Sequence, residues 1–210
     1  MDRTKLSALA GALLIAWTAH VATQSGAPRS GEWREYGADQ GYTKYSPLDQ
    51  INKDNVSRLQ IAWRRPAIAD EIRAQAPNVV VNNSFRSTPI MVDGMLYSSD
   101  GIGLVEAFDA GTGKTMWVQE VEGPEQMRAG GSSRRISYWK NGNDARIFSV
   151  RGEYLYAIDP KTGKLIHGFG DNGRVGLRAG LGPLAKGFAA TSGPTVCNDV
   201  VMAAVNGDAD

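Results

Sequence analysis

The 210-residue chain has very little cysteine and histidine: one cysteine, Cys197, and two histidines, His20 and His167. A single cysteine cannot form an internal disulfide, and the one histidine beyond the N-terminal segment cannot build a zinc cluster. The charge is balanced, with a formal net charge of +1, which argues against nucleic acid as the main partner. The flanks of the cysteine, "PTVCNDVVM", read as a strand and predict that the Cys197 side chain is buried.

Apolar residues at helical spacing are scarce after the first segment, whereas glycine is abundant, with 25 residues. Many glycines between short apolar runs are typical of strands joined by tight turns. The length is enough for one good-sized globular unit. The composition therefore predicts an all-β protein with many turns.

The first 24 residues differ from the rest of the chain. Arg3 and Lys5 precede an apolar run from Leu6 to Trp17, and small residues follow. This order is that of a secretory signal peptide, and the run is shorter than the roughly 20 residues that span a bilayer. We expect residues 1–24 to be a signal peptide or, alternatively, an uncleaved N-terminal anchor. Either would direct the chain to a bacterial periplasm or to the outside of the cell.

The stretch "GLVEAFDAGTGKTMW" at 103–117 contains Gly-Lys-Thr, which also ends phosphate-binding loops. Such a loop needs a glycine five residues before the Gly-Lys pair, where this chain has Phe108. A hairpin fits better, because strand-forming residues flank 109–113, and aspartate and glycine are turn residues. We predict strands over 104–108 and 114–118 joined by this turn.

The same pattern returns 50 residues later. "AFDAGTGKTMW" at 107–117 aligns with "AIDPKTGKLIH" at 157–167, and each copy follows a predicted pair of strands. A third copy starts at "SGPTVCNDVVMAAV". A four-strand unit repeated at this spacing predicts a β-propeller, because one such sheet cannot bury both faces without its neighbours. Trp117 is then expected to fill the wedge between two blades, with its indole N–H on a carbonyl.

The Ala-x-Asp-x-x-Thr-Gly-x-x-x-Trp spacing of 107–117 is similar to the blade motif of the quinoprotein dehydrogenases, and the second copy differs by His167 in the tryptophan place. "EWREYGADQGYTKYSPLDQINKDNVSRLQIAWR" at 32–64 resembles the N-terminal segment of the same family, reading as a short capped helix followed by a strand. That family folds as an eight-bladed propeller and uses pyrroloquinoline quinone (PQQ). The resemblance implies a ring-closing segment over 25–66 and the first two to three blades over 67–210.

The resemblance also implies residues that contact PQQ. "SSRRISYW" at 132–139 is similar to a family segment of the form Asn-Arg-Gly-x-x-Tyr-Trp, which places the cofactor-contacting arginine on Arg134. "AATSGP" places a cofactor-contacting threonine on Thr191, and Arg86 of "FRSTP" is a further candidate. A guanidinium can hold one of the three PQQ carboxylates through two parallel hydrogen bonds. Without the resemblance, these side chains read as solvated arginines and a turn hydroxyl.

A metal ligand is implied in the same way. Relatives place a metal-ligating carboxylate after the strand that "NGDAD" follows, which implies Asp208 as a ligand of Ca²⁺ or Mg²⁺. The alternative is an ordinary turn aspartate. The catalytic aspartate of the family lies beyond Asp210, so the resemblance implies no catalytic residue in this chain.

The resemblance implies a periplasmic dehydrogenase that oxidises a sugar, polyol or other alcohol and passes electrons to a quinone or cytochrome; export also allows association with a membrane. Alcohol-oxidising relatives carry adjacent cysteines shortly before the arginine, whereas this chain reads "MRAGGSSRR" there. This difference favours the sugar and polyol branch. Two alternatives stay open: a non-catalytic propeller scaffold of the outer-membrane assembly type, and a truncated product without a stable fold, whose exposed sheet edge favours aggregation.

Overall fold

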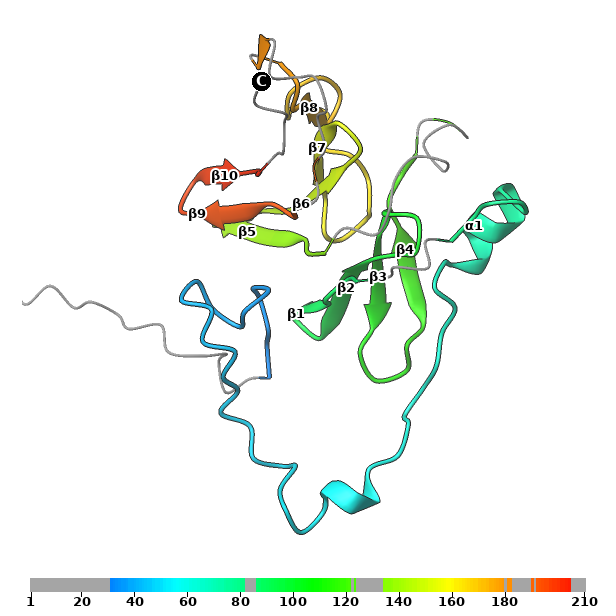
Figure 1. The fold of residues 1–210 in the computed structure, drawn as a ribbon, viewed down its shortest axis with the longest axis vertical. Helices are drawn as coiled ribbons and strands as arrows, with labels where there is room; N and C mark the ends of the chain where they lie inside the picture. The colour runs from blue at the N-terminus through cyan, green and yellow to red at the C-terminus, as the bar shows by residue number, and fades with distance from the viewer. Residues whose placement is uncertain are drawn as a thin grey trace, which may run out of the picture.

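The computed structural model of the protein contains two four-stranded antiparallel sheets, a further two-stranded sheet and an extended N-terminal segment (Figure 1). The structure describes residues 31–81, 86–121, 123, 134–179, 181–182, 190 and 192–204. Within these residues, no helix is long and apolar enough to cross a membrane. The antiparallel sheets confirm the all-β class that the glycine-rich sequence predicts.

Blade 1 consists of β1 (Ile90–Val92), β2 (Met95–Ser99), β3 (Val105–Asp109) and β4 (Thr115–Val118), hydrogen-bonded in that order. β1 and β2 join through Asp93 and Gly94, which both have positive φ, of 50° and 79°. Such a two-residue turn matches the twist of the strands that it joins. The hairpin predicted over 104–118 is formed by β3 and β4, so the Gly-Lys-Thr stretch turns the chain as expected.

Blade 2 repeats this order with β5 (Ser137–Asn141), β6 (Asp144–Arg151), β7 (Tyr154–Ile158) and β8 (Arg174–Gly176). Its fourth strand does not follow the motif turn directly, because Leu165 forms only an isolated bridge with Ile158 before the chain runs on to β8. His167, in the tryptophan place, is exposed. A hairpin of β9 (Thr195–Cys197) and β10 (Val200–Met202) begins blade 3 and lies beside β5 (Figure 1).

Neighbouring blades bury their facing surfaces against each other. One cluster combines Ile90, Val105 and Ala107 of blade 1 with Ile136, Ile147, Ile158 and Leu165 at blade 2. Another combines Phe148, Val150 and Leu155 of blade 2 with Val196 of blade 3. Each fully buried isoleucine contributes about 1.5–3 kcal/mol. These clusters depend on contacts between blades, as the repeat predicts.

Trp117 makes the expected link between blades. Its indole Nε1 donates to the carbonyl oxygen of Pro160 at 3.1 Å, on the turn that follows β7. The ring lies so close to Gly163 of that turn that a Cβ on this glycine would be 2.6 Å from it. The tryptophan of blade 1 therefore requires a glycine in blade 2.

Trp63 makes the same contact one blade earlier. Its Nε1 donates to the carbonyl oxygen of Ala110 at 3.0 Å, and a Cβ on Gly113 would be 2.6 Å from the ring. Both tryptophans thus dock on the residue after the motif aspartate and on the motif glycine. This equivalence identifies Trp63, in the N-terminal segment, as the docking side chain that precedes blade 1.

The turn that receives Trp63 is held by its own aspartate. Asp109 Oδ1 accepts hydrogen bonds from the Thr112 amide at 2.8 Å and the Thr112 hydroxyl at 2.7 Å. These bonds hold the pKa of Asp109 below its ordinary value. Lys114, beside them, is exposed as expected. The motif residues therefore build the docking surface rather than a phosphate site.

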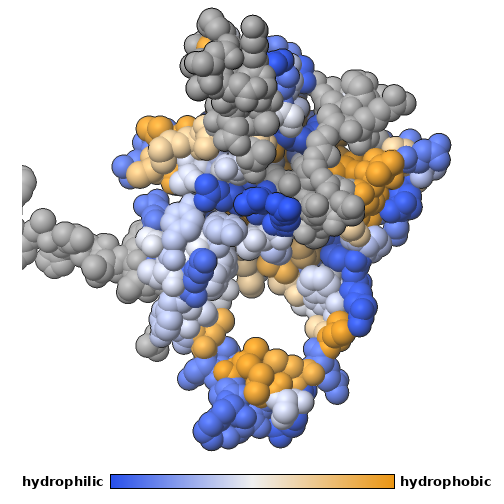
Figure 2. Space-filling view, viewed as in Figure 1, coloured by the Kyte–Doolittle hydropathy of each residue, from blue (hydrophilic) through white to orange (hydrophobic). Residues whose placement is uncertain are grey.

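The N-terminal segment touches blade 1 and then loops away from the sheets (Figure 1). Trp33 forms an antiparallel bridge with Met91 of β1. Further on, the loop contains one 3₁₀ turn, Val56–Arg58, where the sequence predicts a short helix. Exposed apolar side chains gather on this loop, at Leu48, Ile51, Val56, Leu59 and Ile61, and Figure 2 shows its apolar far end. We call these five residues the apolar loop face.

The prediction of a strand immediately after that turn is wrong. Residues 59–64 form no sheet pairing, and Leu59 and Ile61 are 58% and 65% exposed. A strand needs a neighbour for its backbone N–H and C=O groups. Among the described residues, no strand lies alongside 59–64 to accept them.

A short connection covers the face of blade 1 that points away from blade 2. The helix α1 (Asp70–Gln75) buries Ile72 against Leu104. Before it, Arg65 forms an ion pair with Glu106 of β3, whose side chain is 1% exposed. Glu106 also accepts a hydrogen bond from the Ala69 amide at 3.0 Å. Burial raises the pKa of Glu106, and Arg65 opposes this shift.

Cys197 is exposed, contrary to the expected burial. It ends β9, where it pairs with Val200 across the hairpin turn. The neighbouring Val196 takes the buried side instead, because successive strand residues point to opposite faces. The apolar flanks therefore predict the strand correctly but not the face that is covered.

Alanine at the docking glycines should destabilise the protein more than alanine at an open glycine. Gly113 and Gly163 have φ of 70° and 73°, and each would press a new Cβ on an indole ring. Gly94 has a φ of 79° with nothing within 4 Å of that position, so Gly94→Ala isolates the backbone cost of about 1–2 kcal/mol. We expect Gly113→Ala and Gly163→Ala to cost about 1–3 kcal/mol more than this control in urea unfolding. Equal losses at all three positions would contradict tight docking.

Glu106→Ala should cost about 3–5 kcal/mol in the free energy of unfolding, because it leaves Arg65 partly buried without its carboxylate. Asp54→Ala is the control, since Lys53 and Asp54 form an ion pair whose side chains are 88% and 75% exposed. Such a surface pair contributes about 0–1 kcal/mol. A Glu106→Ala loss no larger than the control would show that the buried pair is not needed for stability.

Candidate functional site

The three chain segments that lead into the first strands of the blades lie side by side. The Thr88 amide, just before β1, donates to the Arg134 carbonyl oxygen at 3.2 Å. The Ser137 hydroxyl, at the start of β5, donates to the carbonyl oxygen of Pro194, just before β9, at 2.6 Å. We call these three segments, 86–89, 134–136 and 192–194, the strand starts. They hold the sequence-predicted Arg86 and Arg134, and Thr191 immediately precedes the third.

Arg86 and Arg134 both present exposed side chains at this place. Among the described residues, neither guanidinium has a hydrogen-bond or ion-pair partner, so both remain available to an anionic ligand. A guanidinium offers five donors in a planar fork that suits a carboxylate. The structure thus brings the two predicted arginines onto neighbouring strand starts. Thr191 and Asp208 lie outside the described residues, and their predicted roles stay predictions.

Ser87 fixes the strand start that carries Arg86. Its hydroxyl oxygen lies 2.7 Å from the Ser98 hydroxyl and accepts from the Ser99 amide at 3.0 Å. Ser98 is nearly buried and Ser99 fully buried at the end of β2. The residue next to Arg86 is therefore anchored to a rigid strand, which limits the positions that the guanidinium can take.

A buried aspartate that the sequence reasoning missed lies at the same end of blade 1. Asp100 is 3% exposed and follows β2. Its Oδ1 accepts from the amides of Ile102 at 2.9 Å and Leu104 at 2.8 Å, while Oδ2 has no partner among the described residues. Burial raises the pKa of Asp100 to about 7, with Arg151 acting against the shift. The sequence signal was an Asp-Gly pair directly after a strand, which also reads as a plain turn.

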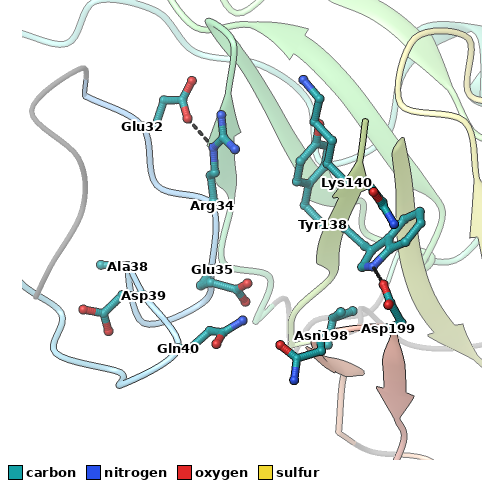
Figure 3. A pocket seen from close by; sticks show the side chains of 13 residues that line it. Glu32, Arg34, Glu35, Ala38, Asp39, Gln40, Tyr138, Lys140, Asn198 and Asp199 are labelled. Carbon is teal, nitrogen blue, oxygen red and sulfur yellow. Dashed lines mark hydrogen bonds and ion pairs between the residues drawn. The ribbon is translucent and has the colours of Figure 1, made fainter. Parts of the chain in front are cut away.

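A cavity of about 860 Å³ lies between the N-terminal segment, the strand β5 and the β9–β10 hairpin. Figure 3 shows Glu35 and Gln40 pointing from the N-terminal segment toward the side where Tyr138 and Asn198 lie. Burial raises the pKa of Glu35 to about 7, opposed by Arg135. The cavity lining includes neither predicted arginine. Within the described part of the chain, no group of three histidine, cysteine or acidic residues could hold a metal ion.

Four-stranded antiparallel sheets that pack face to face and repeat along the chain define this protein as a β-propeller, represented here by two blades and a hairpin of a third. Residues 33–209 match the family model described as "Glucose/ethanol/alcohol dehydrogenase, beta-propeller domain" (PQQ). The chain belongs to this family. The match includes both predicted arginines and both copies of the turn motif.

Characterised relatives align over much of the chain. The dehydrogenase subunit of alcohol dehydrogenase (quinone) from Gluconobacter oxydans (strain 621H) is 33% identical over 140 residues, 65% of this chain and 16% of that protein. The glycerol dehydrogenase large subunit from the same organism is 30% identical over 196 residues, 85% of this chain and 25% of that protein. Quinoprotein glucose dehydrogenase, also from this organism, is 30% identical over 194 residues, 83% of this chain and 23% of that protein. This chain therefore spans a quarter or less of these relatives.

Solved structures support the fold. Quinohemoprotein alcohol dehydrogenase from Comamonas testosteroni superposes with a TM-score of 0.64 at 23% identity, covering 86% of this chain and 24% of that one. A europium-containing methanol dehydrogenase gives a TM-score of 0.58 at 24% identity, over 84% of this chain and 28% of that one. At these identities the likeness establishes the propeller architecture alone.

Asp100→Asn should flatten the dependence of stability on pH. The folded-state pKa of Asp100 is about 7, well above the pKa of about 4 expected for an unfolded aspartate. Between these values the folded state keeps a proton that the unfolded state releases, so stability falls as pH rises from about 4 to 7. Asparagine can still accept both amide hydrogen bonds and does not titrate, so the fall should shrink.

Asp109→Asn is the matched contrast for this measurement. The pKa of Asp109 is lowered, so its stabilisation is present above the unfolded-state pKa and is lost as pH falls. Urea unfolding between pH 4 and 8 should show a changed slope for Asp100→Asn, whereas Asp109→Asn should lower stability at neutral pH and approach the wild type as the pH falls toward 4. An unchanged slope for Asp100→Asn would mean that this carboxyl is ionised throughout.

Proposed function

We propose that this chain is the N-terminal part of a PQQ-dependent dehydrogenase that oxidises CH–OH groups. The observation that carries the proposal is the pair of exposed guanidiniums, Arg86 and Arg134, on adjacent strand starts. PQQ is a tricarboxylate, and two guanidiniums from neighbouring blades can hold two of its carboxylates while leaving the ring free. We propose Thr191, beside the third strand start, as a further hydrogen-bonding contact. The bound PQQ supplies the quinone that accepts a hydride from the substrate carbon.

Residues 1–210 supply only part of the ring in this proposal. The relatives are about four times as long as this chain, because the aligned 140 and 196 residues make up 16% and 25% of their lengths. The apolar loop face of the N-terminal segment is a large exposed apolar surface of the kind that marks a contact site. We propose that residues 25–66 close the ring by packing this face against the last blade, and that the catalytic base lies beyond Asp210.

The substrate class that we propose is a polyol or sugar. The sequence has no adjacent cysteines before Arg134. The alignments to the glycerol and glucose dehydrogenases also extend over 85% and 83% of the chain, compared with 65% for the alcohol dehydrogenase subunit. Both observations favour the same branch.

The metal, location and electron acceptor complete the proposal. We propose Asp208 as one ligand of a Ca²⁺ or Mg²⁺ ion, because carboxylate oxygens suit both cations. Residues 1–24 would direct the protein to the periplasm, with the electrons leaving to a quinone or a cytochrome. A membrane-bound quinone would bring the protein to the membrane surface.

The test is a PQQ titration of the full-length protein, followed by absorbance and fluorescence with Ca²⁺ or Mg²⁺ present. Arg134→Ala should raise the Kd about 10- to 100-fold, because a charged hydrogen bond contributes about 1.5–3 kcal/mol. Arg86→Ala should have an effect of the same kind. Lys164→Ala, which removes an exposed cation from a turn that follows β7, is the control and should leave the Kd unchanged. A folded full-length protein that does not bind PQQ would favour the alternative of a non-catalytic propeller scaffold.

A further inference from the structure

Arg135 joins three separate segments of the chain at the strand starts. Its Nε donates to the Gly193 carbonyl oxygen at 3.1 Å, and its Nη1 donates to the Tyr42 hydroxyl oxygen at 2.6 Å. The guanidinium also lies over the rings of Tyr36 and Tyr42, 5.7 and 5.8 Å from their centroids. One side chain therefore ties the N-terminal segment and the start of blade 3 to the start of blade 2.

Arg135 contacts Gly193 through its own backbone as well as through its side chain. A Cβ on Gly193 would lie 2.2 Å from the Arg135 carbonyl oxygen and 2.3 Å from its Cγ. Only glycine can therefore occupy this position while Arg135 stays where it is. Because Arg134 directly precedes Arg135, this contact fixes the backbone next to Arg134 against the start of blade 3.

The tyrosine that receives Arg135 is itself held in place. Tyr42 has a φ of 55°, a conformation that tyrosine adopts only when its surroundings impose it. Asp39, which is buried, accepts from the Thr43 amide at 3.1 Å and from the Thr43 hydroxyl at 2.9 Å. A Cβ on Gly37 would be 2.7 Å from Tyr42. These contacts constrain the backbone that carries Tyr42, whose side chain presents its hydroxyl to Arg135.

Arg135 stands where the quinoprotein segment Asn-Arg-Gly-x-x-Tyr-Trp has its glycine. A glycine there could make none of these side-chain contacts. We propose that Arg135 is a positioning residue of the cofactor site, which holds the strand starts of blades 2 and 3 together and so fixes the backbone that carries Arg134. This inference rests on the proposed function, because it concerns how that site binds PQQ.

The test measures PQQ affinity and thermal stability separately in the full-length protein. Arg135→Met keeps an unbranched apolar stem but removes the guanidinium and its donors, and the Kd for PQQ should rise about 10-fold, since the bonds to Gly193 and Tyr42 are lost. Arg135→Lys, which can still donate to the Gly193 carbonyl, should recover part of the affinity. Tyr42→Phe removes the bond to the Tyr42 hydroxyl and should raise the Kd about 2- to 10-fold. It is also the milder variant if Arg135→Met does not fold.

A double-mutant cycle separates positioning from direct contact or general stability. If Arg135 acts through Arg134, then Arg135→Met should change the Kd much less in an Arg134→Ala background than in the wild type. Fully additive effects would overturn the positioning role, as would an unchanged Kd in the folded Arg135→Met and Tyr42→Phe variants. If the wild-type protein binds no PQQ, the proposed function and this role are both overturned. If the wild type binds PQQ and the variants bind it equally tightly, only the role of Arg135 is overturned.

Discussion

The docking of a tryptophan on the turn of the following blade is the contact on which the other features depend. Trp63 and Trp117 each place an indole ring against a glycine and an N–H on a carbonyl of the next motif turn. Because the same donor, acceptor and glycine recur, blade 1 takes the same place relative to the N-terminal segment as blade 2 takes relative to blade 1. The apolar cluster between blades 1 and 2 then forms from side chains that belong to different repeats. The indole ring fills the space beside the turn, and its N–H donates a hydrogen bond to a turn carbonyl. Both requirements restrict which residues the turn can have.

Because the blades stack regularly, the strand starts come together at the ends of the sheets opposite the docking turns. In an antiparallel meander the start of the first strand and the β2–β3 loop lie at one end, while the docking turns lie at the other. The three strand starts meet at the first end, where Arg86 and Arg134 are exposed and Arg135 and Ser87 are anchored. The docking contacts thus lie at one end of each blade and the candidate cofactor contacts at the other. A change of residue in a strand start therefore leaves the docking turn intact.

Much of the fold and part of the site could be predicted from the sequence. The turn at 109–113, its second copy at 157–167 and the role of Trp117 follow from local patterns, because turn residues and strand formers act over a few positions. Burial of Cys197 and pairing of 59–64 could not be predicted, since both depend on which neighbour covers a strand. Arg135 was missed for a related reason, because its partners Tyr42 and Gly193 lie tens of residues away. Asp100 has local partners, Ile102 and Leu104, but its burial could not be predicted from an Asp-Gly pair.

The sequence by itself determined the all-β class, the repeat and the docking motif, because each depends on residue types at short spacings. The two candidate arginines came from the resemblance to the quinoprotein dehydrogenases. Tertiary structure alone decided that Arg86 and Arg134 sit on neighbouring strand starts, and that Gly193 must be glycine because Arg135 lies against it. It also decided that Asp100 is buried, which raises its pKa to about 7. Burial and contact between distant segments are properties of packing, and no local pattern of residues specifies them.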